Sequence, residues 1–323
     1  MLTICAEFPD IDVLWNFKGL VEAMAHHRGF THSFVGAPIV SIVVLSVIYL
    51  FHRWRLRHGK SPPLAPRWAV LFLLGIVAVL SHILLDFTNN YGVRPLLPFN
   101  WSWYSWDIVF IIEPVMLLAL LLGLVLPAIF ALIGSEIGAR REKFRGRWSA
   151  VAALLAICAM WWVRDYQHRR AITLLNSGDY HGEAVKRADA MPFAVNPFSW
   201  AGIVETQSFY AEVPIDLPSS SVDPLEHAKI LYKPAETSAT LAAKQSPLGR
   251  AYLDWARFPL LESEPLPPPD TGYEVRFRDL RFDYAALHVP GQVPDRSPLS
   301  ADVVLDRNLH VVLMRMGRRE EKT

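Results

Sequence analysis

The stretch WAVLFLLGIVAVLSHILLD, residues 68–86, decides the fold of this chain. Its apolar run from about Trp68 to Leu85 approaches the roughly 20 residues that a helix needs to cross a bilayer. The stretch closes with two ionisable residues, His82 and Asp86, four positions apart. Residues at that spacing share one face of a helix and lie one turn apart. The stretch therefore predicts a spanning helix with an imidazole and a carboxylate near one end.

Three other apolar stretches, about Phe34–Phe51, Ile108–Ile133 and Trp148–Val163, have a length that suits a spanning helix. The chain is 52% hydrophobic and only 20% charged, which is too apolar for an ordinary soluble protein of 323 residues. The apolar excess lies almost entirely before about residue 165. We therefore expect a polytopic α-helical membrane domain of about four spanning helices over residues 1–164.

The connecting loops predict the orientation of this domain. Two loops are rich in Lys and Arg, and four alternating spans put both on one side, which the positive-inside rule identifies as the cytoplasm. The loop at 86–107 holds only Arg94 as a fixed cation and falls on the opposite side. The chain is thus predicted to be a multi-pass inner-membrane protein with an extracytoplasmic C-terminal domain. The basic residues are Arg53, Arg55, Arg57, Lys60 and Arg67 in one loop and Arg140, Arg141, Lys143, Arg145 and Arg147 in the other.

Residues 165–323 have the pattern of a soluble α+β domain with an antiparallel sheet. The stretch YEVRFRDLRF at 273–282 alternates as a strand does, and residues 301–316 are typical of a hairpin. A net charge of +1 argues against a nucleic-acid partner. We also expect helices at 165–176, 183–190 and 238–257, strands at 202–213 and 227–233, and a Pro-rich loop at 262–270.

Ionisable residues from four separate segments map to the outer face of the predicted membrane domain. Imidazole nitrogens and carboxylate oxygens are ligands of zinc, manganese and iron. A bound divalent ion would also explain ionisable groups so near the hydrocarbon, where isolated charges are costly. The residues of this cluster are Asp10, Asp12, His27, Arg28, His32, His82, Asp86, Asp107 and Glu113.

Each member of the cluster has a structural alternative. Asp107 could cap the third helix, and Glu113 could pair with a polar group of a neighbouring helix. Arg28 could balance a carboxylate or hold an anionic part of a substrate. His82 and Asp86 could form an ordinary hydrogen bond between helices. The two aspartates of the N-terminal PDID sequence could be turn residues.

Four motifs resemble those of one family. They are PDID at 9–12, HHRGFTHS at 26–33, SHILLDFTNNYGVRPLLPF at 81–99 and SWDIVFIIEP at 105–114. In order and spacing they resemble the YdjM/YbcI-type inner-membrane proteins, which are described as membrane-bound metal-dependent hydrolases. The resemblance covers about residues 7–115. The stretch NPFSWAGIVETQSFY at 196–210 resembles the long-tailed branch of the same family.

The resemblance implies a divalent metal and hydrolysis. Two departures stand out: Glu113 takes a place where Asp is usual, and the family's Thr-His pair, which precedes the PDID element, is missing from this sequence. We therefore expect either an upstream start or a site with one ligand fewer. The family's polar motif residues fall on Asp10, Asp12, His27, Arg28, His32, His82, Asp86 and Asp107.

These observations lead to the hypothesis of a membrane-bound metal-dependent hydrolase. A divalent metal, zinc before manganese or iron, would activate water against a lipid or phosphoester substrate. The alternative is a non-enzymatic membrane protein with a structural polar cluster and a C-terminal domain that binds a partner. A transporter is disfavoured because no paired inverted halves are evident. The hypothesis assigns His27, His32, His82 and Asp86 as metal ligands with Asp12 and Asp10 as further ligands, Asp107 and Glu113 as candidate bases, and Arg28 as the anion-binding residue.

Overall fold

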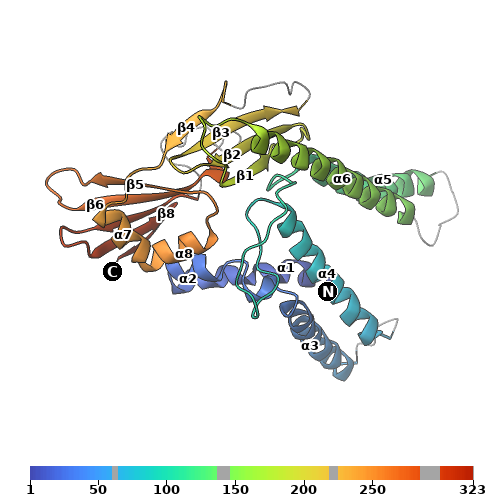
Figure 1. The fold of residues 1–323 in the computed structure, drawn as a ribbon. Coiled ribbons are helices and arrows are strands. Elements are labelled where there is room, and N and C mark those ends of the chain that lie inside the picture. The colour runs from blue at the N-terminus through green and yellow to red at the C-terminus, as the bar shows by residue number, and fades with distance from the viewer. Residues whose placement is uncertain (60–64, 137–145, 218–224, 284–298, 323) are drawn as a thin grey trace. The chain divides into compact units, whose positions relative to one another are not determined.

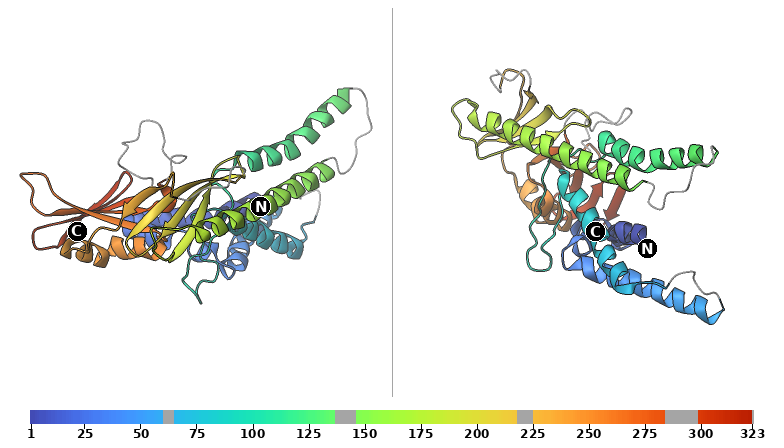
Figure 2. Two further views of the ribbon diagram at one scale, coloured as in Figure 1. Left: turned by 45° about the horizontal axis from the view of Figure 1, so that its top comes forward. Right: turned by 90° about the vertical axis from the view of Figure 1, so that its right-hand side faces the viewer.

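The computed structural model describes residues 1–59, 65–136, 146–217, 225–283 and 299–322 (Figures 1 and 2). Apolar helices come first and antiparallel sheets with two short helices follow, which confirms the predicted fold class. Contacts divide the chain into two compact units, described separately below. Unit 1 comprises Met1–Trp106 with Lys233–Thr323, and unit 2 comprises Asp107–Tyr232. The boundary predicted from the sequence, at residue 164, divides the chain differently, into a membrane domain and a water-exposed domain. That division stays a prediction.

Two long apolar helices form the membrane part of unit 1. Helix α3 (Gly36–Arg57) packs along α4 (Trp68–Thr88), and the short α1 (Leu2–Glu7) packs against α4. Gly75 permits this packing, because a Cβ there would lie 3.3 Å from the Cys5 sulfur. Only 28% and 17% of the apolar windows of α3 and α4 are buried within the structure. The apolar side chains that remain exposed are those that a bilayer would cover.

A compact N-terminal segment precedes α3. It consists of the 3₁₀ helix η1 (Phe8–Lys18), α2 (Leu20–His26) and the short 3₁₀ helix η2 (Phe30–His32). The turn from η2 into α3 requires glycine, since a Cβ on Gly36 would lie only 2.1 Å from the Phe30 carbonyl oxygen. Ser33 Oγ accepts a hydrogen bond from the Gly36 N–H at 2.9 Å. This tight turn places His32 directly before the first spanning helix.

The C-terminal part of unit 1 is a five-stranded antiparallel sheet in consecutive order. Helices α7 (Ser238–Gln245) and α8 (Pro247–Trp255) pack against it, and α2 contributes Leu20 and Met24 to the same core. The strands are β5 (Pro259–Pro265), β6 (Tyr273–Asp279), β7 (Ala301–Leu305), β8 (Val311–Met316) and β9 (Arg319–Lys322).

A buried polar network joins this sheet to the loop after α4. Arg281 lies in the 3₁₀ turn η4 (Leu280–Phe282) and pairs with Asp279 at 2.7 Å. Its guanidinium also donates to the carbonyl oxygen of Asn90 at 2.8 Å and to that of Trp255 at 3.0 Å. The Trp255 indole N–H in turn donates to the Tyr91 carbonyl oxygen at 3.1 Å. The loop that follows the second spanning helix is therefore held by the C-terminal sheet.

Unit 2 combines two helices with a four-stranded antiparallel sheet, also in consecutive order. Helix α5 (Pro114–Glu136) packs along α6 (Arg147–Ser177), and Ala171 and Leu175 of α6 enter the core of the sheet. The strands are β1 (Arg187–Pro192), β2 (Ser199–Glu205), β3 (Phe209–Asp216) and β4 (Lys229–Tyr232).

The spanning segments agree with expectation except at two boundaries. Helices α3, α4 and α6 are long and apolar enough to cross a membrane, and α5 contains the shorter apolar segment Pro114–Phe130. The third helix begins at Pro114 and not at Ile108, because the residue before a proline avoids the helical conformation. The fourth helix continues through the expected separate helix at 165–176, since no Gly or Pro interrupts it.

Several expectations for the C-terminal half were wrong in detail. Residues 183–190 are not a helix; part of this stretch forms β1. The single strand expected at 202–213 is a hairpin that turns at Thr206. Pro247 splits the helix expected at 238–257, and β5 occupies much of the expected loop at 262–270. Lys60 and the basic residues at 140–145, which served for the orientation, lie outside the described residues.

Replacement of Arg281 should destabilise unit 1 strongly. In Arg281→Ala the Asp279 carboxylate stays buried without its cation, which costs about 3–5 kcal/mol. We expect the melting temperature of the purified protein to fall by roughly 10 °C or more. The exposed Arg307→Ala is the matched control and should change it by about 1–2 °C at most. Equal melting temperatures for both variants would contradict the role given to this network.

Candidate metal site

Four side chains from three elements of unit 1 converge on one point. Asp10 comes from η1, His32 ends η2, and His82 and Asp86 lie one turn apart in α4. His32 Nε2 lies 3.6 Å from Asp10 Oδ1 and 3.3 Å from Asp86 Oδ2. His82 Nε2 lies 3.5 and 3.4 Å from the same two oxygens. One ligand atom each of Asp10, His32 and His82 lies within 4.8 Å of the other two, so these residues form a candidate metal site.

The donor atoms of this cluster fit a metal ion better than a hydrogen-bond network. His32 Nε2, His82 Nε2 and Asp86 Oδ2 are buried, yet none has a hydrogen-bond partner among the described residues. Buried polar atoms without partners are rare, because each costs about 1–3 kcal/mol. Ligand atoms that share an ion with bonds of about 2.0–2.2 Å lie about 3–3.6 Å apart. The observed separations of 3.3–3.6 Å fall within that range.

The second ring nitrogen of His32 is held by neighbouring oxygens. Thr31 donates its hydroxyl hydrogen to the Pro9 carbonyl oxygen at 2.8 Å, so its lone pair is free to face His32 Nδ1 at 3.3 Å. Asp12 Oδ2 lies 3.5 Å from the same nitrogen. This arrangement favours a hydrogen on Nδ1 and leaves Nε2 as the ligand atom, as in most histidines that bind metals.

Arg28 holds one of the carboxylates. Its guanidinium pairs with Asp86 Oδ1 at 2.9 Å, donates to Asn89 Oδ1 at 3.2 Å and stacks on the Tyr91 ring at 4.8 Å. Asp86 therefore presents one oxygen to Arg28 and the other to the two imidazoles. Of the two interpretations considered for Arg28, the contacts match the one in which it balances a carboxylate.

Electrostatic coupling is strong within the N-terminal part of the cluster. Contact with the His32 imidazole lowers the pKa of the Asp10 carboxyl below its ordinary value. Burial by itself lowers the pKa of His32, but its contacts with Asp10 and Asp86 outweigh burial and raise it. The cluster thus attracts positive charge to its centre, which a proton or a metal ion can supply.

His27 and Asp12 lie beside the three-residue group. His27 Nδ1 lies 3.5 Å from Asp12 Oδ1, and 40% of its side chain is exposed. Asp12 is buried and accepts a hydrogen bond from the Arg28 backbone N–H at 2.6 Å. Asp12 therefore links His27 to His32. The assignment of His27 and Asp12 as direct metal ligands stays a prediction.

Asp107 and Glu113 belong to unit 2 and are described within it. Glu113 is buried and pairs with Arg164 Nη2 of α6 at 2.8 Å. It also accepts hydrogen bonds from the Val195 N–H at 3.0 Å and from the Val115 N–H at 3.4 Å at the start of α5. These contacts match the helix-pairing alternative considered for Glu113. Asp107 is buried with φ at 59°, and its role as a base stays a prediction.

Sequence reasoning did not identify three residues that contact members of the predicted cluster. Thr31 and Asn89 stand inside the recognised motifs, and their side-chain oxygens could have been considered as partners of His32 and Arg28. Arg164, which directly follows the apolar stretch Trp148–Val163, was not considered as the partner of Glu113. Its position at the end of an apolar stretch could have suggested a buried partner, since charges there are costly unless paired.

The motifs around the cluster place this chain among known proteins. The sequence profile of the YdjM inner membrane protein family matches residues 1–171, slightly more than half of the chain. The chain belongs to the YdjM inner membrane protein family. This YdjM-family protein is therefore an inner-membrane protein, and every residue of the cluster lies within the matched region.

The YdjM-family chain is also similar to a bacterial protein over part of its length. The YdjM-family chain is 28% identical over 109 residues to the uncharacterized protein YfhP of Bacillus subtilis (strain 168). The match covers 34% of this chain and only 30% of the length of that relative. No solved structure matches the chain.

Replacement of Glu113 should separate a structural role from a role in the metal site. In Glu113→Ala the Arg164 guanidinium stays buried without its partner, which costs about 3–5 kcal/mol. We expect a melting temperature roughly 10 °C lower or more, with the metal content per folded chain unchanged by elemental analysis. The exposed Glu226→Ala is the control in the same unit. Loss of metal from a Glu113→Ala protein that keeps its melting temperature would overturn this assignment.

Proposed function

We propose that this YdjM-family protein is a membrane-bound metal-dependent hydrolase. The convergence of two buried imidazole nitrogens and a carboxylate oxygen without hydrogen-bond partners is the observation that supports it. Asp10, His32 and His82 form the core of the ligand set, and Asp86 adds an oxygen 3.3–3.4 Å from both imidazoles. Zinc suits this mixture of nitrogen and oxygen ligands, and manganese or iron would be accepted too.

The side chains around the ligands have separate roles in this proposal. Asp12 keeps the His32 ring in the orientation that leaves Nε2 free, and Arg28 keeps one oxygen of Asp86 turned towards the imidazoles. When bound, a divalent ion supplies Lewis acidity and lowers the pKa of water at the site. In ester hydrolysis the water oxygen bonds to the acyl carbon or phosphorus, the ester bond to the alcohol breaks, and the alcohol leaves with a proton. Asp10, which is 56% exposed, is placed to exchange that proton with solvent.

The metal content of the purified protein tests the proposal first. We expect about one divalent ion per chain in detergent-solubilised protein and at least a tenfold weaker affinity in His32→Ala and His82→Ala, since each removes a ligand. Asp12→Asn should weaken affinity by about 10–100-fold, because it disturbs the orientation of a ligand. His52→Ala, in α3 and outside the cluster, is the matched control and should bind metal normally.

Two further measurements test whether the site holds a metal and whether that metal supports hydrolysis. A chelator should lower the melting temperature of the wild type and leave that of His82→Ala unchanged. At a free metal concentration 100 times the dissociation constant, bound metal stabilises the folded protein by about 2.7 kcal/mol.

Bis(4-nitrophenyl) phosphate and 4-nitrophenyl octanoate serve as phosphoester and ester probes of activity. Metal-dependent turnover of either probe by the wild type, lost in His82→Ala, is the expected result. Metal-free wild-type protein, or metal-loaded protein inert to both probes, would count against the proposal.

The orientation of the chain is a further part of the proposal. We expect the C-terminal sheet to be extracytoplasmic and the loop after α3 to be cytoplasmic, as the basic loops indicate. In a background without Cys5 and Cys158, a membrane-impermeant maleimide should label Arg307→Cys in intact spheroplasts. The same reagent should label Arg55→Cys only after lysis. The opposite pattern would reverse the topology.

A further inference from the structure

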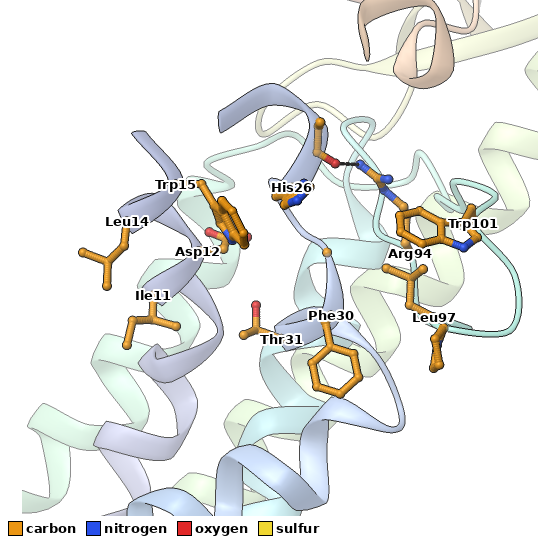
Figure 3. A pocket seen from close by; sticks show the side chains of 13 residues that line it. Ile11, Asp12, Leu14, Trp15, His26, Phe30, Thr31, Arg94, Leu97 and Trp101 are labelled. Carbon is orange, nitrogen blue, oxygen red and sulfur yellow. Dashed lines mark hydrogen bonds between the residues drawn. The ribbon is translucent and has the colours of Figure 1, made fainter. Parts of the chain in front are cut away.

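A pocket of about 460 Å³ lies beside the candidate metal site within unit 1. Figure 3 shows Ile11, Leu14 and Trp15 of η1 on one side of it and Phe30, Leu97 and Trp101 on the other. Apolar and aromatic side chains thus form most of its wall. Its volume lies in the range of pockets that bury small molecules, about 300–1,000 Å³.

The pocket shares a wall with the metal cluster. Asp12 and Thr31 line the pocket, and the same two residues contact His32 Nδ1 at 3.5 and 3.3 Å. His32 presents its other nitrogen to the centre of the cluster. Asp12, Thr31 and the ring of His32 therefore lie between the pocket and the centre of the cluster.

One buried cation also lines the pocket. Arg94 is 3% exposed, and its Nη2 donates to the Ala25 carbonyl oxygen at 2.7 Å. Its nearest carboxylate, Asp254 Oδ2, is half-exposed and 3.7 Å away, and its Nε has no partner among the described residues. Burial lowers the pKa of Arg94, and Asp254 offsets this only in part. The pocket therefore combines an apolar wall with an incompletely neutralised positive charge.

The pocket is formed by segments that adjoin the ends of two spanning helices. The pocket residues Phe30 and Thr31 lie a few residues before α3 begins at Gly36, and Arg94 lies a few residues after α4 ends at Thr88. The two segments that form the pocket also carry exposed aromatic rings, and Phe17 and Phe99 are 87% and 85% exposed. Exposed aromatic and apolar side chains at the ends of spanning helices are typical of a bilayer interface.

We propose that this pocket binds one hydrocarbon chain of an anionic membrane lipid, with the anionic head group drawn to Arg94. A chain in the pocket excludes water from apolar side chains, while the head group offsets the Arg94 charge. A free phosphate would offset the Arg94 charge but would leave the apolar side chains of the pocket in contact with water.

Photolabelling of the full-length protein in vesicles tests the proposal. The probe is phosphatidylglycerol with a diazirine in its acyl chain, present as a minor component of phosphatidylcholine vesicles. We expect labelled peptides to include residues 11–15 or 97–101. Leu14→Arg should reduce this labelling roughly tenfold or more, because it places a charge beside the hydrocarbon chain.

The neighbouring position supplies a matched control. Val13 is 57% exposed and Leu14 is 52% exposed, yet only Leu14 lines this pocket. Val13→Arg should leave labelling within twofold of the wild type. Phosphatidylcholine with the same diazirine chain should label the pocket at least threefold less than the anionic probe. Equal labelling of both variants, or label confined to α3 and α4, would overturn the pocket assignment, and equal labelling by the two lipids would overturn the anionic preference.

Metal analysis of the same samples separates the two proposals. Leu14→Arg should keep the metal content of the wild type, since Leu14 contributes no ligand atom. Metal-loaded protein without pocket labelling would refute the lipid pocket and leave the hydrolase proposal standing. Pocket labelling of wild-type protein that binds no metal would refute the hydrolase and leave the lipid-binding pocket standing.

Discussion

Two buried imidazole nitrogens and a buried carboxylate oxygen face one another without a hydrogen bond at the end of the second spanning helix. A set of polar atoms in this position is costly unless something at its centre binds them all. A divalent cation meets this need, because it accepts electron pairs from several donors at once and offsets the negative charge of the carboxylates. The surrounding structure of unit 1 keeps these atoms together.

The support for this arrangement comes from parts of the chain that are far apart in sequence. Asp12 and Thr31 orient His32, and Arg28 orients Asp86. Tyr91 stacks on Arg28, and its carbonyl oxygen accepts a hydrogen bond from Trp255 next to the C-terminal sheet. The five-stranded sheet is thus mechanically connected to the metal cluster through the loop after α4. A displacement of that loop would therefore move Arg28 and with it Asp86.

Unit 2 uses ionisable residues for a different purpose. Glu113 and Arg164 pair with each other and with backbone groups of the 193–195 segment. This pair holds the start of α5 to the middle of α6. Glu113 and Arg164 bind each other at 2.8 Å, whereas His32 Nε2, His82 Nε2 and Asp86 Oδ2 face one another without a hydrogen bond. Single atoms without a partner occur elsewhere in the described part of the chain, Arg164 Nε among them, so the convergence of three such atoms distinguishes the candidate site.

Apolar length and residue spacing determined the helical class of the first half of this chain, since a bilayer demands about 20 apolar residues whatever the rest of the fold does. Spacing alone also determined that His82 and Asp86 share a face, because four residues make about one helical turn. The sequence could not decide the partners of Glu113 and Arg28, which depend on side chains 51 and 58 positions away. The sequence also could not show that Asp10 and His32 converge with His82, whereas His27 contacts Asp12. Those distinctions depend on the left-handed backbone at Arg28 and the tight turn at Gly36, and such turns orient side chains only once the tertiary packing around them has formed.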